Sequence, residues 1–298
     1  MPRLPIEWYD HDQNTKERKI LTATRYHVPG LRMIGHQNTT RATAPLPIHY
    51  HKNCFEFTYV VQGNLTFSVN GESHPLSGGD LFITQPNEVH DTGNTPMSLH
   101  QMYWFQLDIS RPDQLLHFTP AFCQWLIDQL LALPPRVVKM DGSTEAILKE
   151  IFSNLDGGSQ VQQAQASAML GVLLCQIVKN SKLPETSVTP DISRATEYIH
   201  CHIRDKIAME ALAEEAMLSV PRFKQKFKSQ IGTSPRNYVN YHKIELAKKL
   251  LQEGRNVTDV AMELGFSGSD YFSVVFKRYT FVSPTDYIRQ VSVPHLPE

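Results

Sequence analysis

The chain has 298 residues, of which 41% are hydrophobic and 20% charged, and its formal net charge at pH 7 is −1. This length leaves room for about two domains, and the near-zero charge excludes a nonspecific polycation that binds nucleic acid by charge alone. The sequence contains no run of 18 uncharged apolar residues and no signal-peptide core at its N-terminus. We therefore expect a cytoplasmic protein with no membrane partner.

Four cysteines, Cys54, Cys123, Cys175 and Cys201, are scattered without a CxxC pair. Such spacing gives no reason to expect a disulfide framework. We expect all four to be buried free thiols.

Residues 20–110 form short runs in which apolar and polar side chains alternate, as they do in β-strands. Asn70-Gly71 separates two such runs, and both residues tolerate the positive φ angles of a tight hairpin turn. Gly78-Gly79-Asp80 marks a second turn. Short strands with turns between them predict a β-sandwich or a small barrel.

Four side chains in this region can share one site: His49, His51, Glu56 and His90. The first two histidines point to the same side of an extended strand, so their imidazoles can converge. With Glu56 and His90 the set offers three nitrogens and a carboxylate, which suits a divalent transition metal. The spacing His-x-His-x4-Glu-x6-Gly with a later His-x3-Asn resembles the cupin signature of a double-stranded β-helix barrel, here over residues 20–108.

Residues 112–181 switch to a helical period. One apolar stripe consists of Phe122, Leu126, Ile127, Leu130 and Leu131, and a second of Met169, Leu170, Leu173, Leu174 and Ile177. The stripes suit either packing on the barrel or a homodimer interface. The polar, proline-bounded segment 183–190 has the composition of a linker.

From Asp191, which we expect to be a helix N-cap, to Val291 the chain reads as all helical, and one pattern occurs twice at an offset of 49 residues. The matched positions are Phe223 and Phe272, Phe227 and Phe276, Lys228 and Lys277, Ser234-Pro235 and Ser283-Pro284, and Tyr238 and Tyr287. Two Phe four residues apart lie on one helical face. Each copy can therefore anchor a helix by two rings and present the opposite face to a partner.

A short helix precedes each copy. The first has Leu212, Ala213, Ala216 and Met217 as apolar positions, and the second has Val257, Val260, Ala261 and Leu264, with Gly265 at the turn. Two short helices joined by a tight turn, the second with an exposed polar face, are typical of a helix-turn-helix that enters the DNA major groove. A plain helical bundle with solvated charges is the alternative, and the duplication favours DNA. A longer helix, from Ser234-Pro235 to about Gly254, would set the two units about 34 Å apart.

Residues 190–290 resemble the AraC/XylS family of transcription regulators. The matching elements are Ala261, Leu264-Gly265-Phe266, Tyr271-Phe272-Ser273, Phe276-Lys277 and Ser283-Pro284-x-x-Tyr287. The resemblance implies that two helix-turn-helix units read a double-stranded promoter, commonly as an activator that works with RNA polymerase.

The two presented faces differ in chemistry. Arg222, Lys224 and Gln225 are the best candidates for contacts with base edges. Lys226, Lys228, Lys277 and Arg278 are expected to contact phosphates. The full set expected at the DNA is Pro221, Arg222, Lys224, Gln225, Lys226, Lys228, Ser269, Asp270, Tyr271, Val274, Lys277 and Arg278. The family often has Arg where Val274 stands and Gly where Phe281 stands. From these departures we expect the first unit to distinguish bases more than the second does. The sequence does not determine the geometry of the turn after the second recognition helix.

In regulators that this chain resembles, the barrel usually holds a small organic effector, often a sugar. The residues expected to bind it are His49, His51, Glu56, His90 and Trp104, of which the first four can instead hold a metal. Tyr103 and His100 are further candidates beside Trp104, and packing in the core is the third interpretation.

We therefore predict a multidomain protein. Residues 1–182 form a cupin-like effector-binding and dimerisation domain, with the barrel at 20–110 and helices at 112–181, and residues 191–298 form an all-α DNA-binding domain after the linker. The predicted function is that of a non-enzymatic, ligand-responsive transcription activator. The alternative is a metal-dependent cupin enzyme, or a direct metal sensor, fused to a DNA-binding domain.

Overall fold

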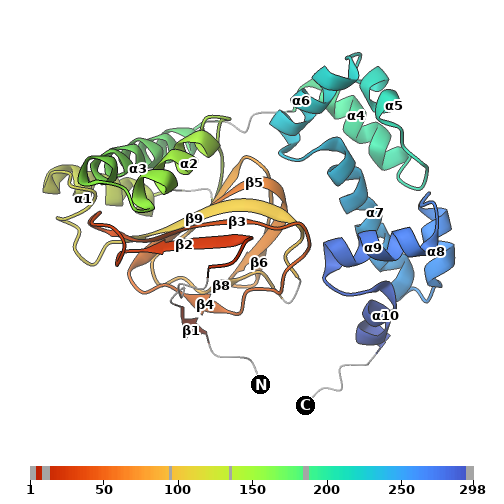
Figure 1. The fold of residues 1–298 in the computed structure, drawn as a ribbon, viewed down its shortest axis with the longest axis horizontal. Helices are drawn as coiled ribbons and strands as arrows, with labels where there is room; N and C mark the ends of the chain where they lie inside the picture. Colours follow the sequence, from red (N-terminus) through yellow and green to blue (C-terminus); the bar gives the residue numbers. More distant parts are fainter. Residues whose placement is uncertain (1–4, 9–13, 94–95, 134–135, 184–187, 293–298) are drawn as a thin grey trace.

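The computed structural model describes residues 5–8, 14–93, 96–133, 136–183 and 188–292. A β-rich part carries three helices, and an all-helical part follows it (Figure 1). We call residues 5–183 the barrel domain and residues 188–292 the helical domain. The strands are β1 (Ile6–Glu7), β2 (Arg18–Thr22), β3 (Leu31–Asn38), β4 (His49–Tyr50), β5 (Cys54–Val69), β6 (Glu72–Ser77), β7 (Asp80–Thr84), β8 (His90–Asp91), β9 (His100–Asp108) and β10 (Val137–Lys139). The helices are α1 (Pro120–Leu131), α2 (Thr144–Leu155), α3 (Gln160–Asn180), α4 (Pro190–Cys201), α5 (Met209–Glu215), α6 (Val220–Ile231), α7 (Pro235–Gln252), α8 (Val257–Glu263), α9 (Ser269–Thr280) and α10 (Pro284–Ser292).

Strand β5 belongs to both sheets of the barrel domain. Its first part pairs antiparallel with β7 and β9, and its second part pairs with β6 and β8. Gly63 lies at the change of partners with a φ angle of 103°, and a Cβ atom there would lie 2.4 Å from the Leu99 carbonyl oxygen. The two sheets therefore curl around a shared interior as a half-barrel, which confirms the predicted cupin-like fold.

The alternation along the strands separates two apolar cores. Met102 and Trp104 of β9 lie in the core inside the barrel, whereas Tyr103 and Phe105 lie in the core beneath the helices. Helices α1, α2 and α3 cover that outer face of the sheet (Figure 1). Period-two alternation is what a sheet buried on both faces by different layers requires.

The Asn70-Gly71 hairpin is confirmed, since both residues have positive φ angles of 53° and 82° between the paired residues Val69 and Glu72. The short strand β10 was not predicted. It pairs antiparallel with β7 inside the segment that the sequence assigned to helices. Three residues are too few to show a period of two.

By length and composition, helix α3 is long and apolar enough to cross a bilayer. However, 44% of its 18-residue apolar stretch is buried inside the structure. Its buried residues pack against the sheet with the other helices, so it serves here as a core helix. In α1, Leu131 was wrongly included in the buried stripe. It is 50% exposed because it lies in the last turn of the helix, beyond the edge of the core.

The first helix of the helical domain begins two residues earlier than expected. Thr189 is the N-cap of α4 and Pro190 occupies the first turn, so Asp191 lies within the helix rather than capping it. Residues 184–187 of the predicted linker lie outside the described residues.

The expectation of four buried thiols is also corrected: Cys54 and Cys123 are buried, Cys175 is half-buried and Cys201 is exposed, and none is in a disulfide.

Candidate DNA-binding and effector sites

The repeated pattern forms two helix-turn-helix units, α5–α6 and α8–α9. The four anchoring rings, Phe223, Phe227, Phe272 and Phe276, are fully buried. Each turn contains a left-handed residue, Met217 with a φ angle of 53° and Gly265 with 65°. Met217 was predicted to be an apolar helix position, but it is 77% exposed because the chain turns there.

The ends of the two recognition helices have the same geometry. Gly232 after α6 and Phe281 after α9 both adopt the left-handed conformation, with φ angles of 74° and 72°. A glycine adopts this conformation without steric cost, whereas a phenylalanine does not. Phe281 thus ends α9 with the same left-handed φ angle that Gly232 gives the end of α6, but at a steric cost.

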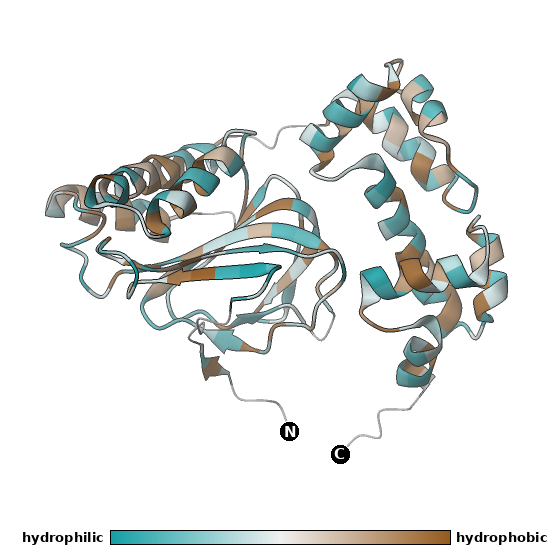
Figure 2. Cartoon of the chain, in the orientation of Figure 1, coloured by the Kyte–Doolittle hydropathy of each residue, from teal (hydrophilic) through white to brown (hydrophobic). Residues whose placement is uncertain are grey.

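The predicted DNA-facing residues are mostly exposed, and hydrophilic residues dominate the α6 ribbon in Figure 2. The exposed ones are Pro221, Arg222, Lys224, Gln225, Lys228, Asp270, Tyr271, Val274, Lys277 and Arg278. Ser269 is half-buried at the start of α9. Lys226 is half-buried and donates a hydrogen bond of 2.6 Å to Asp191, so its ammonium faces α4. Arg236 of α7 was not predicted as part of this surface, although it donates to the Tyr271 hydroxyl at 3.4 Å.

In the barrel, His49, His51 and His90 are buried, and one ring nitrogen of each lies within 4.8 Å of the others. Glu56 joins them, with its carboxylate 3.0 Å from His51 Nε2 and 3.6 Å from His90 Nε2. Gln106 of β9, which was not predicted, donates to Glu56 at 2.9 Å. The structure thus brings together all four residues that the sequence grouped. Asn94, the last residue of the cupin spacing, lies outside the described residues.

Backbone carbonyls determine the proton positions on the histidines. The Nδ1 atoms lie 2.6 Å from the Pro47 carbonyl oxygen for His49, 3.1 Å from that of Trp8 for His51 and 3.0 Å from that of Glu88 for His90. A carbonyl only accepts, so each Nδ1 carries a hydrogen, and in a neutral imidazole this leaves Nε2 with its lone pair. His90 Nε2 is buried without a hydrogen-bond partner among the described residues. Buried lone pairs oriented in this way are what a metal ligand set requires.

The electrostatics favour a neutral His49 and an ionised Glu56. Burial, with a contribution from His90, lowers the pKa of His49 to about 4. Burial alone would raise the pKa of the Glu56 carboxyl, but the His51 charge and hydrogen bond, together with His90, hold it well below the ordinary value. A neutral imidazole and a carboxylate are the forms that bind a cation.

A cavity of about 250 Å³ adjoins these residues, and His49, Glu56 and Trp104 contribute to its wall. Trp104 therefore lies where the sequence predicted it, whereas Tyr103 packs against the His36 ring at 4.4 Å on the outer side. The ring nitrogen Nδ1 of His100 lies 2.6 Å from the Ser98 carbonyl oxygen. The polar wall residues missed by the sequence analysis are Arg18, Gln37, Thr43 and Thr58. They come from separate strands and loops without a motif, so only strand alternation could have indicated them.

Two family comparisons match separate parts of the chain. A helix-turn-helix domain matches residues 212–290, and a cupin domain matches residues 42–103. The curated relatives include the HTH-type transcriptional activator RhaS of Salmonella typhimurium and of Salmonella newport. Each is 24% identical over 254 residues, which are 83% of this chain and 88% of the relative.

Solved structures also resemble the chain. ToxT from Vibrio cholerae O395 is 14% identical and covers 93% of this chain and 100% of its own, with a TM-score of 0.35. The C-terminal domain of AraT from Geobacillus stearothermophilus is 25% identical and covers 38% of this chain and 95% of its own, also with a TM-score of 0.35. We base no conclusion on scores this low.

The relatives are transcription regulators rather than enzymes, so the interpretation as a cupin enzyme is not supported. The cupin match covers the buried histidines and Glu56, and the helix-turn-helix match covers both recognition helices. The chain is therefore a homologue of HTH-type transcription regulators such as RhaS, with a cupin domain over residues 42–103 followed by a helix-turn-helix domain over residues 212–290.

Proposed function

We propose that this protein is a cytoplasmic transcription activator that responds to a small polar effector bound in the barrel and acts on RNA polymerase at its promoter. The observation that carries the proposal is the cavity of about 250 Å³, mainly apolar with a few polar side chains in its wall, in the same chain as two recognition helices that each expose one face. Small-molecule sites are concave, with an apolar lining and a few polar groups that orient the ligand. A cavity of this volume suits a small metabolite such as a sugar.

We infer that the first unit supplies most of the base discrimination. Arg222, Lys224 and Gln225 give α6 donors that can pair with guanine or adenine edges, whereas α9 presents Tyr271 and Val274 at the corresponding surface. Lys228, Lys277 and Arg278 supply phosphate contacts. Lys226 was expected among these, and its ion pair with Asp191 has to open before it can contribute.

Selection of duplexes from a randomised library by the full chain tests this assignment. The selected duplex should bind Arg222→Ala about 10-fold or more weakly, the loss of one good base contact. Lys149→Ala removes an exposed charge from α2 in the barrel domain and should bind as wild type. Unchanged affinity and base preference in Arg222→Ala would overturn the assignment of α6 as the reader.

A divalent transition metal is the second ligand that we propose for the barrel. His49, His51 and His90 would hold it through Nε2, with Glu56 as the fourth ligand and Gln106 orienting Glu56. The metal would supply a Lewis-acidic point for an oxygen of the effector. The Nδ1 contacts to three carbonyls support this interpretation, because a hydrogen bond at Nδ1 leaves Nε2 of each ring as the nitrogen that can bind a metal.

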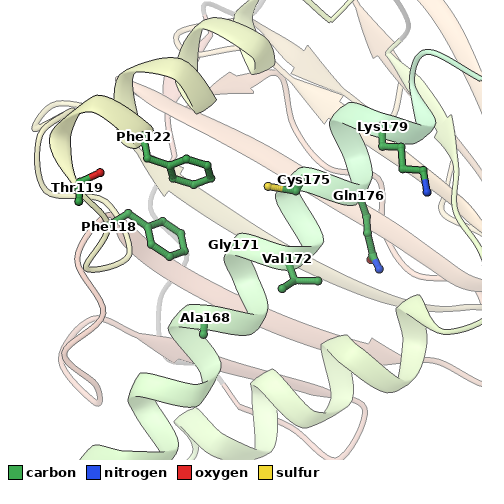
Figure 3. A pocket seen from close by; sticks show the side chains of 9 residues that line it. All are labelled: Phe118, Thr119, Phe122, Ala168, Gly171, Val172, Cys175, Gln176 and Lys179. Atoms are coloured by element: carbon green, nitrogen blue, oxygen red, sulfur yellow. The ribbon is translucent and has the colours of Figure 1, made fainter.

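The protein is further proposed to be a homodimer. An apolar groove of about 770 Å³ lies between the start of α1 and α3, with Phe118 and Phe122 on one side and Gly171 and Cys175 on the other (Figure 3). Val172 at its edge is 54% exposed. A twofold interface pairs the same patch on both subunits, so we propose that α1 and α3 of a second copy cover the groove.

A further inference from the structure

The described residues include two contacts between the barrel domain and a recognition helix; α6 and α9 both lie on the side of the helical domain that is turned toward the barrel domain (Figure 1). At the first, Gly78 of the β6–β7 turn lies against Gly232, the residue that ends α6. A Cβ atom on either glycine would lie 1.9 Å from the carbonyl oxygen of the other, so the two backbones are in direct contact. Gly78 itself lies outside the left-handed region, so the contact with Gly232 is what excludes a side chain there.

A cleft of about 270 Å³ lies beside this contact, between α6 and the barrel domain. On the α6 side it is lined by Gln225, Lys228 and Ser229, which belong to the polar surface of that helix. On the other side it is lined by Asp141 and Glu145. Hydrogen bonds from the Ser143 side chain and backbone lower the pKa of Asp141, so it is ionised at neutral pH. Carboxylates therefore face a lysine that is proposed to contact DNA phosphates.

The second contact involves α9. The Ala42 amide donates to the Arg278 carbonyl at 2.7 Å, and Arg278 Nε donates to the Thr40 carbonyl at 3.0 Å. Leu99 of the barrel domain also packs in the apolar core of the second unit. A residue proposed to contact phosphate is thus hydrogen-bonded to the barrel domain.

The segment of the barrel domain that hydrogen-bonds to Arg278, residues 40–42, continues directly into the wall of the effector cavity. Thr43, Ala44 and Leu46 line the cavity, and Thr43 forms a two-residue bridge with Met97, which also lines it. A ligand that displaces this wall would therefore move a segment only a few residues away from Thr40 and Ala42, and so disturb their hydrogen bonds with Arg278.

We propose that this docked arrangement is a DNA-excluding state, in which the barrel domain competes with DNA for the recognition helices; the inference rests on the proposed DNA-binding function. A recognition helix must enter a major groove about 12 Å wide. The barrel domain covers part of the α6 surface that would have to enter this groove. Asp141 and Glu145 face Lys228 where phosphates would lie, and Arg278 is held by Thr40. DNA binding therefore requires undocking, and the affinity of the full chain is reduced by the fraction of molecules that are docked.

Two substitutions in the barrel domain open the cleft without altering the proposed DNA-binding residues. Gly78→Ala places a methyl group against the Gly232 backbone, and its matched control is Gly142→Ala, in the same cleft but with no atom within 4 Å of the added Cβ. Glu145→Lys places a positive charge opposite Lys228. Its control is Glu150→Lys, which makes the same charge change at an exposed position of the same helix, outside the cleft.

The readouts are affinity for the duplex selected from the randomised library and hydrogen exchange of the peptide covering residues 39–46. If the open state is populated at roughly 1–10%, Gly78→Ala and Glu145→Lys should bind that duplex about 10- to 100-fold more tightly than their controls. Exchange at the Ala42 amide should be faster in Gly78→Ala than in Gly142→Ala. Melting temperatures like those of the controls establish that the variants are folded.

The outcomes separate the two proposals. If no variant and no wild-type protein enriches any duplex, the DNA-binding function fails, and this inference fails with it. If wild type, Gly78→Ala and Glu145→Lys bind the selected duplex with the same affinity as the controls, DNA binding stands and the DNA-excluding docking is refuted. Unchanged exchange at residues 39–46 in Gly78→Ala refutes the linkage between the two contacts.

Discussion

Lys243 of α7 donates a hydrogen bond of 2.6 Å to the carbonyl of Leu264, in the turn of the second helix-turn-helix unit. The same ammonium donates at 2.7 Å to the carbonyl of Asp205, in the loop between α4 and α5 of the first unit. Gly265 packs against that loop, because a Cβ atom there would lie 2.9 Å from the Asp205 carbonyl carbon. The buried ammonium of Lys243 thus links the loop before α5 to the turn between α8 and α9. It helps to fix the orientation of one helix-turn-helix unit relative to the other.

Replacement of Lys243 by Met should destabilise the helical domain. The change leaves the buried Leu264 carbonyl and the part-buried Asp205 carbonyl without their donor, and we expect a loss of about 2–4 kcal/mol in the free energy of unfolding. Chemical denaturation followed by circular dichroism measures it. Lys249→Met on the exposed face of the same helix is the control and should change stability little. Equal stability of both variants would mean that the Lys243 contacts contribute nothing.

Phe281→Gly should stabilise the protein. Phe281 holds a left-handed conformation with a φ angle of 72°, and its side chain is 51% exposed, so little burial is lost. Relief of the steric cost should add about 1 kcal/mol to the free energy of unfolding. Met262→Gly, at an exposed position in the ordinary helical turn of α8, should instead lose about 1 kcal/mol. A loss in both variants would contradict the strain at Phe281.

His90→Ala should weaken metal binding in the barrel. The lost ligand should reduce affinity for Zn²⁺ or Ni²⁺ by at least roughly 10- to 100-fold, the effect of removing a group that only orients a metal ligand. Calorimetric titration and elemental analysis of protein purified without chelator measure it, and His27→Ala, an exposed histidine outside the cluster, is the control. The affinity of wild type should also fall on acidification, because protons compete for Nε2. A metal-free wild type that does not respond to added metal would rule out the metal site.

Val172→Asp should produce a monomer. A carboxylate at the edge of the apolar groove has to lose its hydration if a second copy covers the groove, and burial of an unpaired charge is costly. Sedimentation velocity should give a smaller species than wild type. Val161→Asp, also exposed but in the first turn of α3 and outside the groove, should behave as wild type. A wild type that is already monomeric at micromolar concentration would contradict the proposed dimer.

Much of the fold was predictable because its signals are local. The Asn70-Gly71 turn, the paired Phe rings of α6 and α9, and the Ser234-Pro235 start of α7 each follow from the conformational preferences of a few neighbouring residues. The His49, His51, Glu56 and His90 set was also predictable, since spacing along strands fixes which side each residue faces. Met217 and Leu131 were misassigned because an apolar residue in a turn or a last helical turn has the same local signal as a buried one.

The sequence by itself determined the element types, the repeated reading unit and the cluster of metal-capable side chains, because periodicity and residue chemistry need no distant partner. Only the tertiary structure decided how these elements meet: the Gly78 and Gly232 contact, the Arg278 contact with Thr40, and the cavity wall around Trp104. Each depends on residues far apart in the chain that are brought together by the packing of whole domains. No local pattern encodes such an approach, since its energy arises only when both surfaces are already folded.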